Sequence, residues 1–251
     1  MSFLIKGGIL KKYTEEPGVT EVIVPDGVKA IGKEAFMDCK NIVSVILPNG
    51  IESIGQSAFY RCRNLESIII PDGVSKINDG TFAYCGSLRN VQLPDSVTAI
   101  GSKKYSVDLC RGVFYDCKNL KEVVIPQNCT YICYDAFGGC SEDLVVVAPA
   151  VTMVDGKNIH VKHSYGWGFL LHSKIYVPSV VEAYSQYVGS QKKYYLPEIF
   201  KKDLVEALAT YAQLGKITKT NFEKDYLAPA TDCGAVQCIA YLLEWKQAMS
   251  K

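Results

Sequence analysis

The sequence predicts an α+β repeat protein, in which a solenoid of 23-residue coils is followed by a small helical C-terminal region. Proline, phenylalanine and cysteine recur at a spacing of 23 residues over the first 150 positions, which is typical of a solenoid. After Pro149 the spacing ends, and from Ser179 onward apolar residues fall at helical spacing instead. An array is expected because one 23-residue unit buries too little apolar surface to fold alone.

Three residue types mark the coils. The prolines are Pro25, Pro48, Pro71, Pro94, Pro126 and Pro149. The aromatic and thiol positions that keep the same phase are Phe36, Phe59, Phe82, Phe114 and Phe137, and Cys39, Cys62, Cys85, Cys117 and Cys140. The step from Pro94 to Pro126 is 32 residues, so nine extra residues, about Ser102 to Cys110, are inserted in the fourth unit.

Each coil contains a turn and a short strand. Pro25-Asp26-Gly27 and its equivalents combine a residue with fixed φ and one that tolerates positive φ, as tight turns require. In the segment Leu65–Ile70, period-two alternation sends Ile68 to the core and Ser67 and Ile69 outward. A hairpin around Gly7 and Gly8 is expected to cap the first coil.

The repeated run resembles a known family. Ile54-Gly55, Ala58-Phe59, Cys62, Leu65, Ile68 and Ile70-Pro71, with their equivalents across residues 19–149, resemble the bacterial leucine-rich repeats of the BspA-like (treponemal) type. The resemblance implies a curved right-handed leucine-rich repeat solenoid used for protein recognition or adhesion, often at bacterial surfaces, and it implies no catalysis. Asn78 and Cys133 depart from the pattern. Asp143 departs from it too, so the sequence does not decide which face of the strand Val145 to Val147 present.

Four segments follow from these patterns. We expect an N-terminal cap at 1–18, the solenoid at 19–150 with its insertion near 102–110, a connecting segment at 151–178, and a helical tail at 179–251. Asp203–Gly215 and Gly234–Leu243 resemble a degenerate ankyrin helix pair. The tail is either a cap for the apolar end of the solenoid or a second binding module.

The strongest candidate for a binding surface is the outward side of the strands. If the coils stack in register, two exposed rows form, and the insertion adds a third group of candidates. These partner-binding candidates are Ile23, Ile46, Ile69, Gln92 and Val124; Glu21, Ser44, Ser67, Asn90 and Glu122; and Lys103, Lys104 and Tyr105. The alternative is a β-branched ladder that serves strand pairing only. Tyr60, Tyr84 and Tyr115 predict a further aromatic patch on the turn edge.

The sequence contains no catalytic motif, and we expect neither an enzyme nor a cofactor. His160 and His163 lie near Asp155 and would bind a metal only if a further ligand joined them, and Cys129 and Cys133 lack the second pair of a zinc site. The alternatives are an enzyme or metal-binding protein that uses these histidines, His172 or Cys110, and a purely structural spacer. The five cysteines in phase are expected to be stacked free thiols rather than disulfides, because neighbouring coils hold them in parallel.

Composition excludes partners that are chosen by bulk charge. The formal net charge is +1 and the mean hydropathy is +0.07. Lys192-Lys193-Tyr194-Tyr195 combines basic and aromatic residues but is interpreted as a solvated helix edge rather than a nucleic-acid site. The longest apolar run, Leu144–Ala148, is too short to span a membrane, and no secretion signal is recognised, so a cytoplasmic location is expected, with the cell surface as the alternative from the resemblance. The predicted function is therefore noncatalytic binding of a protein or peptide.

Overall fold

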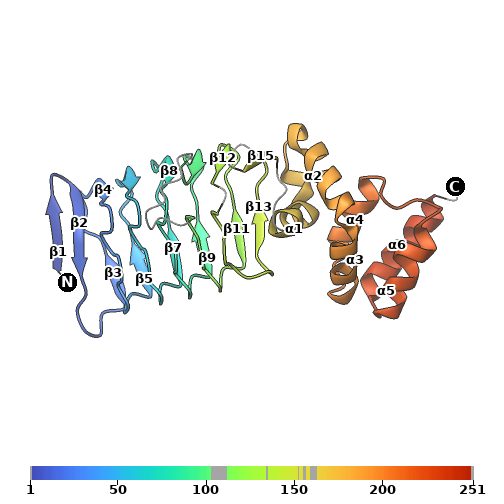
Figure 1. The fold of residues 1–251 in the computed structure, drawn as a ribbon, viewed down its shortest axis with the longest axis horizontal. Coiled ribbons are helices and arrows are strands. Elements are labelled where there is room, and N and C mark those ends of the chain that lie inside the picture. Colours follow the sequence, from blue (N-terminus) through green and yellow to red (C-terminus); the bar gives the residue numbers. More distant parts are fainter. Residues whose placement is uncertain are drawn as a thin grey trace. The chain divides into compact units, whose positions relative to one another are not determined.

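The computed structural model describes residues 2–102, 112–133, 135–151, 153–154, 157–158 and 163–249. The chain forms two compact units, Met1–Ser164 and Tyr165–Lys251. The first unit is a β-solenoid and the second is helical, which confirms the predicted fold class (Figure 1).

Short parallel strands on two sides of each coil build the solenoid. One side carries three-residue strands: the four-stranded sheet of β3 (Glu21–Ile23), β5 (Ser44–Ile46), β7 (Ser67–Ile69) and β9 (Asn90–Gln92), and the pair β11 (Glu122–Val124) and β13 (Val145–Val147). The other side is a nine-stranded sheet of β1 (Ser2–Lys6), β2 (Ile9–Thr14), β4 (Ala30–Ile31), β6 (Ser53–Ile54), β8 (Lys76–Ile77), β10 (Ala99–Ile100), β12 (Tyr131–Ile132), β14 (Met153–Val154) and β15 (Lys157–Asn158).

The strand register equals the sequence period. Ser44 pairs with Ser67 in β5 and β7, and Ile69 pairs with Gln92 in β7 and β9, so equivalent residues of successive coils lie side by side. The face of β13 is also settled. Val123 pairs with Val146, which is buried, so the strand keeps its phase although Leu144, rather than residue 143, fills the preceding core position.

The core of the solenoid is a continuous stack of aromatic rings. The rings of Phe36, Phe59, Phe82, Phe114 and Phe137 follow one another at centroid distances of 4.9, 5.4, 5.5 and 5.2 Å, with interplanar angles of 7–11°. The hairpin predicted around Gly7 and Gly8 is present as β1 and β2, and it continues this stack. β2 pairs with β4, and the Tyr13 ring lies 5.3 Å from that of Phe36.

A row of thiols runs beside the phenylalanine stack. From the second coil on, the cysteine of the row donates its S–H to the carbonyl of the phenylalanine that marks the preceding coil: Cys62 to Phe36 at 3.0 Å, and Cys85 to Phe59, Cys117 to Phe82 and Cys140 to Phe114 at 3.1 Å. The nine cysteines within the described part of the chain are free thiols. The cysteine position therefore links neighbouring coils through hydrogen bonds.

The helical part of the chain contains, among its described residues, six α-helices and two other helical segments. These are α1 (His163–His172), η1 (Ser173–Ile175), α2 (Pro178–Ser190), α3 (Lys192–Lys201), α4 (Val205–Gln213), η2 (Phe222–Leu227), α5 (Ala228–Asp232) and α6 (Val236–Ala248). Its core is rich in tyrosine, and Phe169, Tyr176 and Tyr184 form a cluster with centroid distances of 4.9–5.2 Å.

The helical part of the chain begins earlier than predicted. Helix α1 lies within 151–178, where we expected a connecting segment. Tyr165, Trp167, Phe169 and Leu170 are all buried, so apolar residues surround this helix instead of forming one stripe. Without a stripe at helical spacing, the sequence pattern gives no signal for a helix.

Candidate functional site

The outward residues of the three-residue strands form two parallel rows. On each strand the residue between the two rows points inward. These residues are all buried, as the period-two alternation requires: Val22, Val45, Ile68, Val91 and Val123. We define the isoleucine row as Ile23, Ile46, Ile69, Gln92 and Val124, and the polar row as Glu21, Ser44, Ser67, Asn90 and Glu122. Both rows therefore lie on the outward side of the strands, as the sequence predicted.

The isoleucine row exposes much apolar surface. Ile23 is 56% exposed, Ile46 49%, Ile69 63% and Val124 50%. In the polar row Ser44 donates a hydrogen bond to the Glu21 carboxylate over 3.2 Å, and Ser67 and Asn90 are exposed. The other predicted candidates, Lys103, Lys104 and Tyr105, lie outside the described residues.

The sheet of three-residue strands is interrupted between β9 and β11. The four-stranded sheet ends at β9, and the pair β11–β13 begins beyond the break. On the other side of the same coils β10 and β12 remain paired, with Ala99 opposite Tyr131. The break falls in the fourth coil, which is the coil with nine extra residues. In this coil the ladder is therefore lost on the side of the three-residue strands and kept on the other side.

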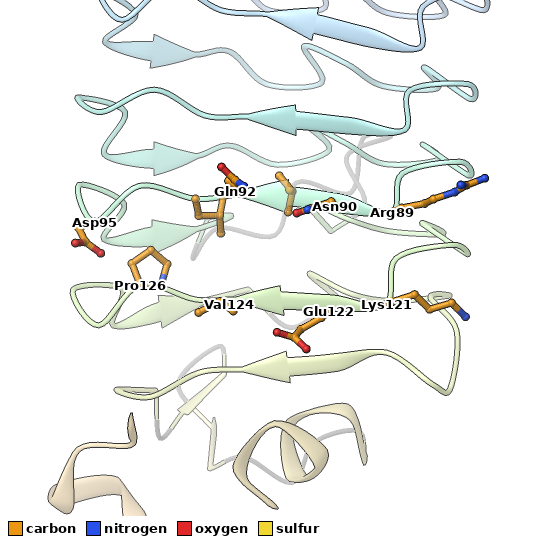
Figure 2. A pocket seen from close by; sticks show the side chains of 10 residues that line it. Arg89, Asn90, Gln92, Asp95, Lys121, Glu122, Val124 and Pro126 are labelled. Carbon is orange, nitrogen blue, oxygen red and sulfur yellow. The ribbon is translucent and has the colours of Figure 1, made fainter. Parts of the chain in front are cut away.

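A hollow of about 400 Å³ lies at this break (Figure 2). Its walls come from β9, from β11 and from the residues that flank them: Arg89, Asn90, Val91, Gln92, Leu93, Asp95, Lys121, Glu122, Val124 and Pro126. Four of these belong to the two rows, whereas Arg89, Asp95, Lys121 and Pro126 were not among the sequence candidates. The signals for them were the long fourth coil and the change from isoleucine to Gln92 in the row.

Comparison with known proteins identifies the repeat. The model of the "BspA type Leucine rich repeat region (6 copies)" matches residues 11–143 and 107–155, which together are more than half of the chain. The chain belongs to the BspA-type leucine-rich repeat family. No curated protein matches it.

Solved structures of bacterial leucine-rich repeat proteins resemble the BspA-type solenoid. A leucine rich cell surface protein from Faecalibacterium prausnitzii is 26% identical with a TM-score of 0.50, over 58% of this chain and 35% of that one. A protein from Bacteroides ovatus is 26% identical (TM-score 0.48, 61% and 44% covered), and the Treponema pallidum leucine rich repeat protein is 25% identical (TM-score 0.47, 61% and 81% covered). The chain therefore spans less than half the length of the first two.

The tyrosine patch on the turn edge of the BspA-type coils is only partly exposed. The rings of Tyr60 and Tyr84 lie 5.4 Å apart, and those of Tyr84 and Tyr115 lie 5.6 Å apart. Arg61 places its guanidinium carbon 5.1 Å from the Tyr60 ring centre and 5.7 Å from that of Tyr84. Tyr60 is buried. The patch thus consists of Tyr84, Tyr115 and Arg61, with Tyr60 packed below them.

The cysteines of the BspA-type core are poor nucleophiles. Burial raises the pKa of Cys39 to about 12 and that of Cys129 to about 11, and it raises the pKa of Cys62, Cys85 and Cys117 well above the ordinary thiol value. The nucleophilic thiolate is therefore disfavoured at these positions.

The metal-ligand candidates of the sequence lie partly outside the described residues. No cluster of three or more histidine, cysteine or acidic side chains able to hold a metal ion occurs among the residues whose placement is described. Asp155, His160 and Cys110 lie outside that set. In the run Lys192-Lys193-Tyr194-Tyr195, Tyr195 is buried, Tyr194 is half-buried, and Lys192 is paired with Asp225 at 2.9 Å. Within the described residues, no helix is both long and apolar enough to span a bilayer.

Proposed function

We propose that this BspA-type solenoid is a noncatalytic module that binds a protein or peptide through the isoleucine row and the polar row. The observation that supports the proposal most strongly is the exposure of three isoleucines, at 49–63%, side by side on one strand face. Paired strands lie about 4.8 Å apart, so the three side chains form one continuous apolar surface. Apolar surface of this kind commonly marks an interaction site.

Family membership supports the same proposal. The Faecalibacterium prausnitzii structure is described as a cell surface protein, and recognition or adhesion is the role that the family resemblance implies. Raised thiol pKa values and the lack of a described metal cluster add nothing in favour of catalysis.

Replacing Ile46 and Ile69 by lysine tests this proposal. Two charges in the centre of the row would have to be desolvated on binding, and central apolar residues of interfaces commonly cost about 2 kcal/mol or more when lost. The wild-type chain and the Ile46→Lys, Ile69→Lys variant are immobilised, and the protein that each captures from a lysate of the source cell is measured by quantitative mass spectrometry. We expect the variant to capture less than a tenth of the partner that the wild type captures.

Ser53→Lys, Ser75→Lys is the matched control. Both serines are exposed and lie on the side of the nine-stranded sheet, so this variant gains the same charge away from the rows. It should capture the partner as the wild type does, and circular dichroism should show that all three proteins are folded. Equal capture by the isoleucine variant and the control would refute binding through the rows, whereas a wild-type chain that captures no partner would favour a structural spacer.

A further inference from the structure

We propose that the hollow between β9 and β11 binds an extended peptide segment of a partner protein, one that carries a carboxylate near one end and a cationic side chain five or six residues away. This inference rests on the proposed function and specifies the partner's chemistry at one place on the strand face. It uses the shape of the hollow, the amide groups on its β9 wall and the charges at its two ends.

The shape of the hollow follows from the interrupted ladder. At the neighbouring junctions, backbone N–H groups just beyond the strands bond to the next coil: Ile70 to Gln92 over 3.0 Å and Ile125 to Val147 over 2.7 Å. β9 and β11 form no such ladder, although some of their Cα atoms lie within 8 Å of each other. A third strand between them would need about 9.6 Å, twice the usual spacing. The occupant therefore lies over the hollow and sends side chains into it.

The β9 wall of the hollow differs in chemistry from the rest of the two rows. Gln92 and Asn90 occupy the positions that Ile69 and Ser67 hold in the preceding coil. A carboxamide both donates and accepts hydrogen bonds, as does the peptide group, so two exposed carboxamides suit an extended main chain. Val124, which is 50% exposed, and Pro126 add an apolar wall beside them (Figure 2).

The two ends of the hollow carry opposite charge. Arg89 and Lys121 lie at the end where the strands begin, and Asp95 lies at the end where they finish (Figure 2). Asp95 comes six positions after Arg89, and the chain is extended over Asn90–Gln92 but turns at Asp95, so a partner segment needs at most about six extended residues, roughly 20 Å, to reach from one end to the other. An extended segment that spans the hollow therefore meets cations at one end and a carboxylate about six residues later.

The cations at the first end remain open to a partner. Arg89 contacts Glu66 at 3.9 Å, but both side chains are well exposed, so this ion pair is weak. Lys121 makes no ion pair within the described part of the chain. Glu122 lies between the ends and disfavours a second acidic residue in the middle of the segment. The charge pattern therefore selects a segment with its carboxylate at the Arg89 and Lys121 end.

Selection from a phage library of random heptapeptides, performed on the immobilised full chain, tests the proposal. We expect the enriched peptides to carry aspartate or glutamate near one end and lysine or arginine five or six positions away. The most enriched peptide is then synthesised with a fluorescent label, and its dissociation constant is measured by fluorescence polarisation. Lys121→Ala and Asp95→Ala should each weaken binding about two- to fivefold, the usual range for an exposed ion pair.

Matched variants separate the hollow from general effects of charge. Lys118→Ala and Asp72→Ala remove the same charges from exposed positions that do not line the hollow, and they should leave the dissociation constant unchanged. Replacing the acidic residue of the peptide by its amide should not add to the loss caused by Lys121→Ala, because both changes remove one interaction.

Three results would overturn the proposal: no enrichment, enriched peptides without the charge pattern, or equal binding by wild type and both hollow variants. Peptides that lose binding to the Ile46→Lys, Ile69→Lys variant but bind the hollow variants normally would refute this site and leave the proposed function intact. The two proposals can therefore fail separately.

Discussion

Individual residues in the turns of the solenoid adopt a backbone conformation that their side chains do not favour. The residue two positions after each core phenylalanine has a φ of 58–72°: Asp38, Arg61, Tyr84, Asp116 and Gly139. Only the last is glycine, and the left-handed conformation costs other residues about 1–2 kcal/mol. The cost is offset by stacking, because the N–H groups of Arg61 and Tyr84 bond to the next coil, at Ala83 and Tyr115, over 2.9 and 2.7 Å.

Asp203 is the residue in the helical unit whose replacement should be most informative. Its carboxylate accepts hydrogen bonds from the backbone N–H groups of Gln237 and Cys238, both at 2.9 Å, and so caps helix α6 from 35 residues away. Ala235, which precedes the helix, offers no side-chain cap. We expect Asp203→Ala to lower the free energy of unfolding by about 1 kcal/mol, measured by urea denaturation at pH 7.

The same cap should make stability depend on pH. The hydrogen bond from Gln237, with that from Cys238, lowers the pKa of Asp203 below its ordinary value. A group with a lowered pKa in the folded state stabilises the protein above its unfolded pKa, near 4, and loses that contribution as the pH falls through the folded value. The difference between wild type and Asp203→Ala should shrink in acid. A difference in the free energy of unfolding that stays constant from pH 7 to pH 3 would contradict the role of the charge. Asp203→Asn controls for backbone strain, because asparagine tolerates the positive φ of this position.

At the scale of secondary-structure elements, short strands gain their stability from the stack beneath them. Each of the strands β3, β5, β7, β9, β11 and β13 has only three residues, too few to be stable alone. The phenylalanine stack and the row of thiols tie the coils together below these strands. The stacked core therefore sets the spacing between neighbouring side chains of the isoleucine row.

Truncation of one ring in the middle of the stack tests this dependence. Phe82 is fully buried, with Phe59 on one side at 5.4 Å and Phe114 on the other at 5.5 Å. Phe82→Ala should lower the free energy of unfolding by about 3–5 kcal/mol, through lost burial and the cavity it leaves. Phe3→Ala, at the half-buried end of the aromatic series, should cost much less. Similar losses in the two variants, measured by chemical denaturation, would show that the stack does not act as the core.

The sequence predicted those elements whose contacts repeat. Coil length, ladder register and the two exposed rows were predictable because each residue contacts its equivalent 23 positions away. The hollow was not, because whether β9 and β11 pair depends on the packing of whole coils. The Asp203 cap joins residues 34 and 35 positions apart without a pattern. The burial of Tyr60 also depends on packing at the turn edge, which neighbouring sequence does not reveal.

The whole solenoid needs its first coil covered. Strand β2 pairs with β4, with Leu10 opposite Ile31, and the Tyr13 ring closes the phenylalanine stack at Phe36. Strand β3 pairs with β5, and among the described strands it has no partner on its opposite edge. Its length of only three residues and the charge of Glu21 limit pairing with other chains at that edge. We therefore expect the N-terminal hairpin to keep the array from associating end to end.

Deletion of residues 2–14 should therefore cause self-association. The deletion exposes the apolar end of the first coil, and terminal repeats of solenoids need a polar outer face for solubility. Size-exclusion chromatography with light scattering should show aggregates for the deletion variant. Leu4→Ser, Ile5→Ser removes two exposed apolar side chains but keeps the hairpin, so it should elute as the full chain does. Identical elution of the deletion variant and the full chain would show that the hairpin is dispensable as a cap.

The coincidence of strand register with sequence period has a consequence for how such surfaces can change. Because the coils of an unbroken sheet offer the same contacts above and below, duplication or loss of one 23-residue segment there would lengthen or shorten the isoleucine row by one residue, about 4.8 Å, without disturbing the other coils. Between β9 and β11 these contacts are missing on one side of the solenoid, while the other side stays paired. Whole-coil duplications therefore extend the surface, whereas a break in one sheet places a concavity in it.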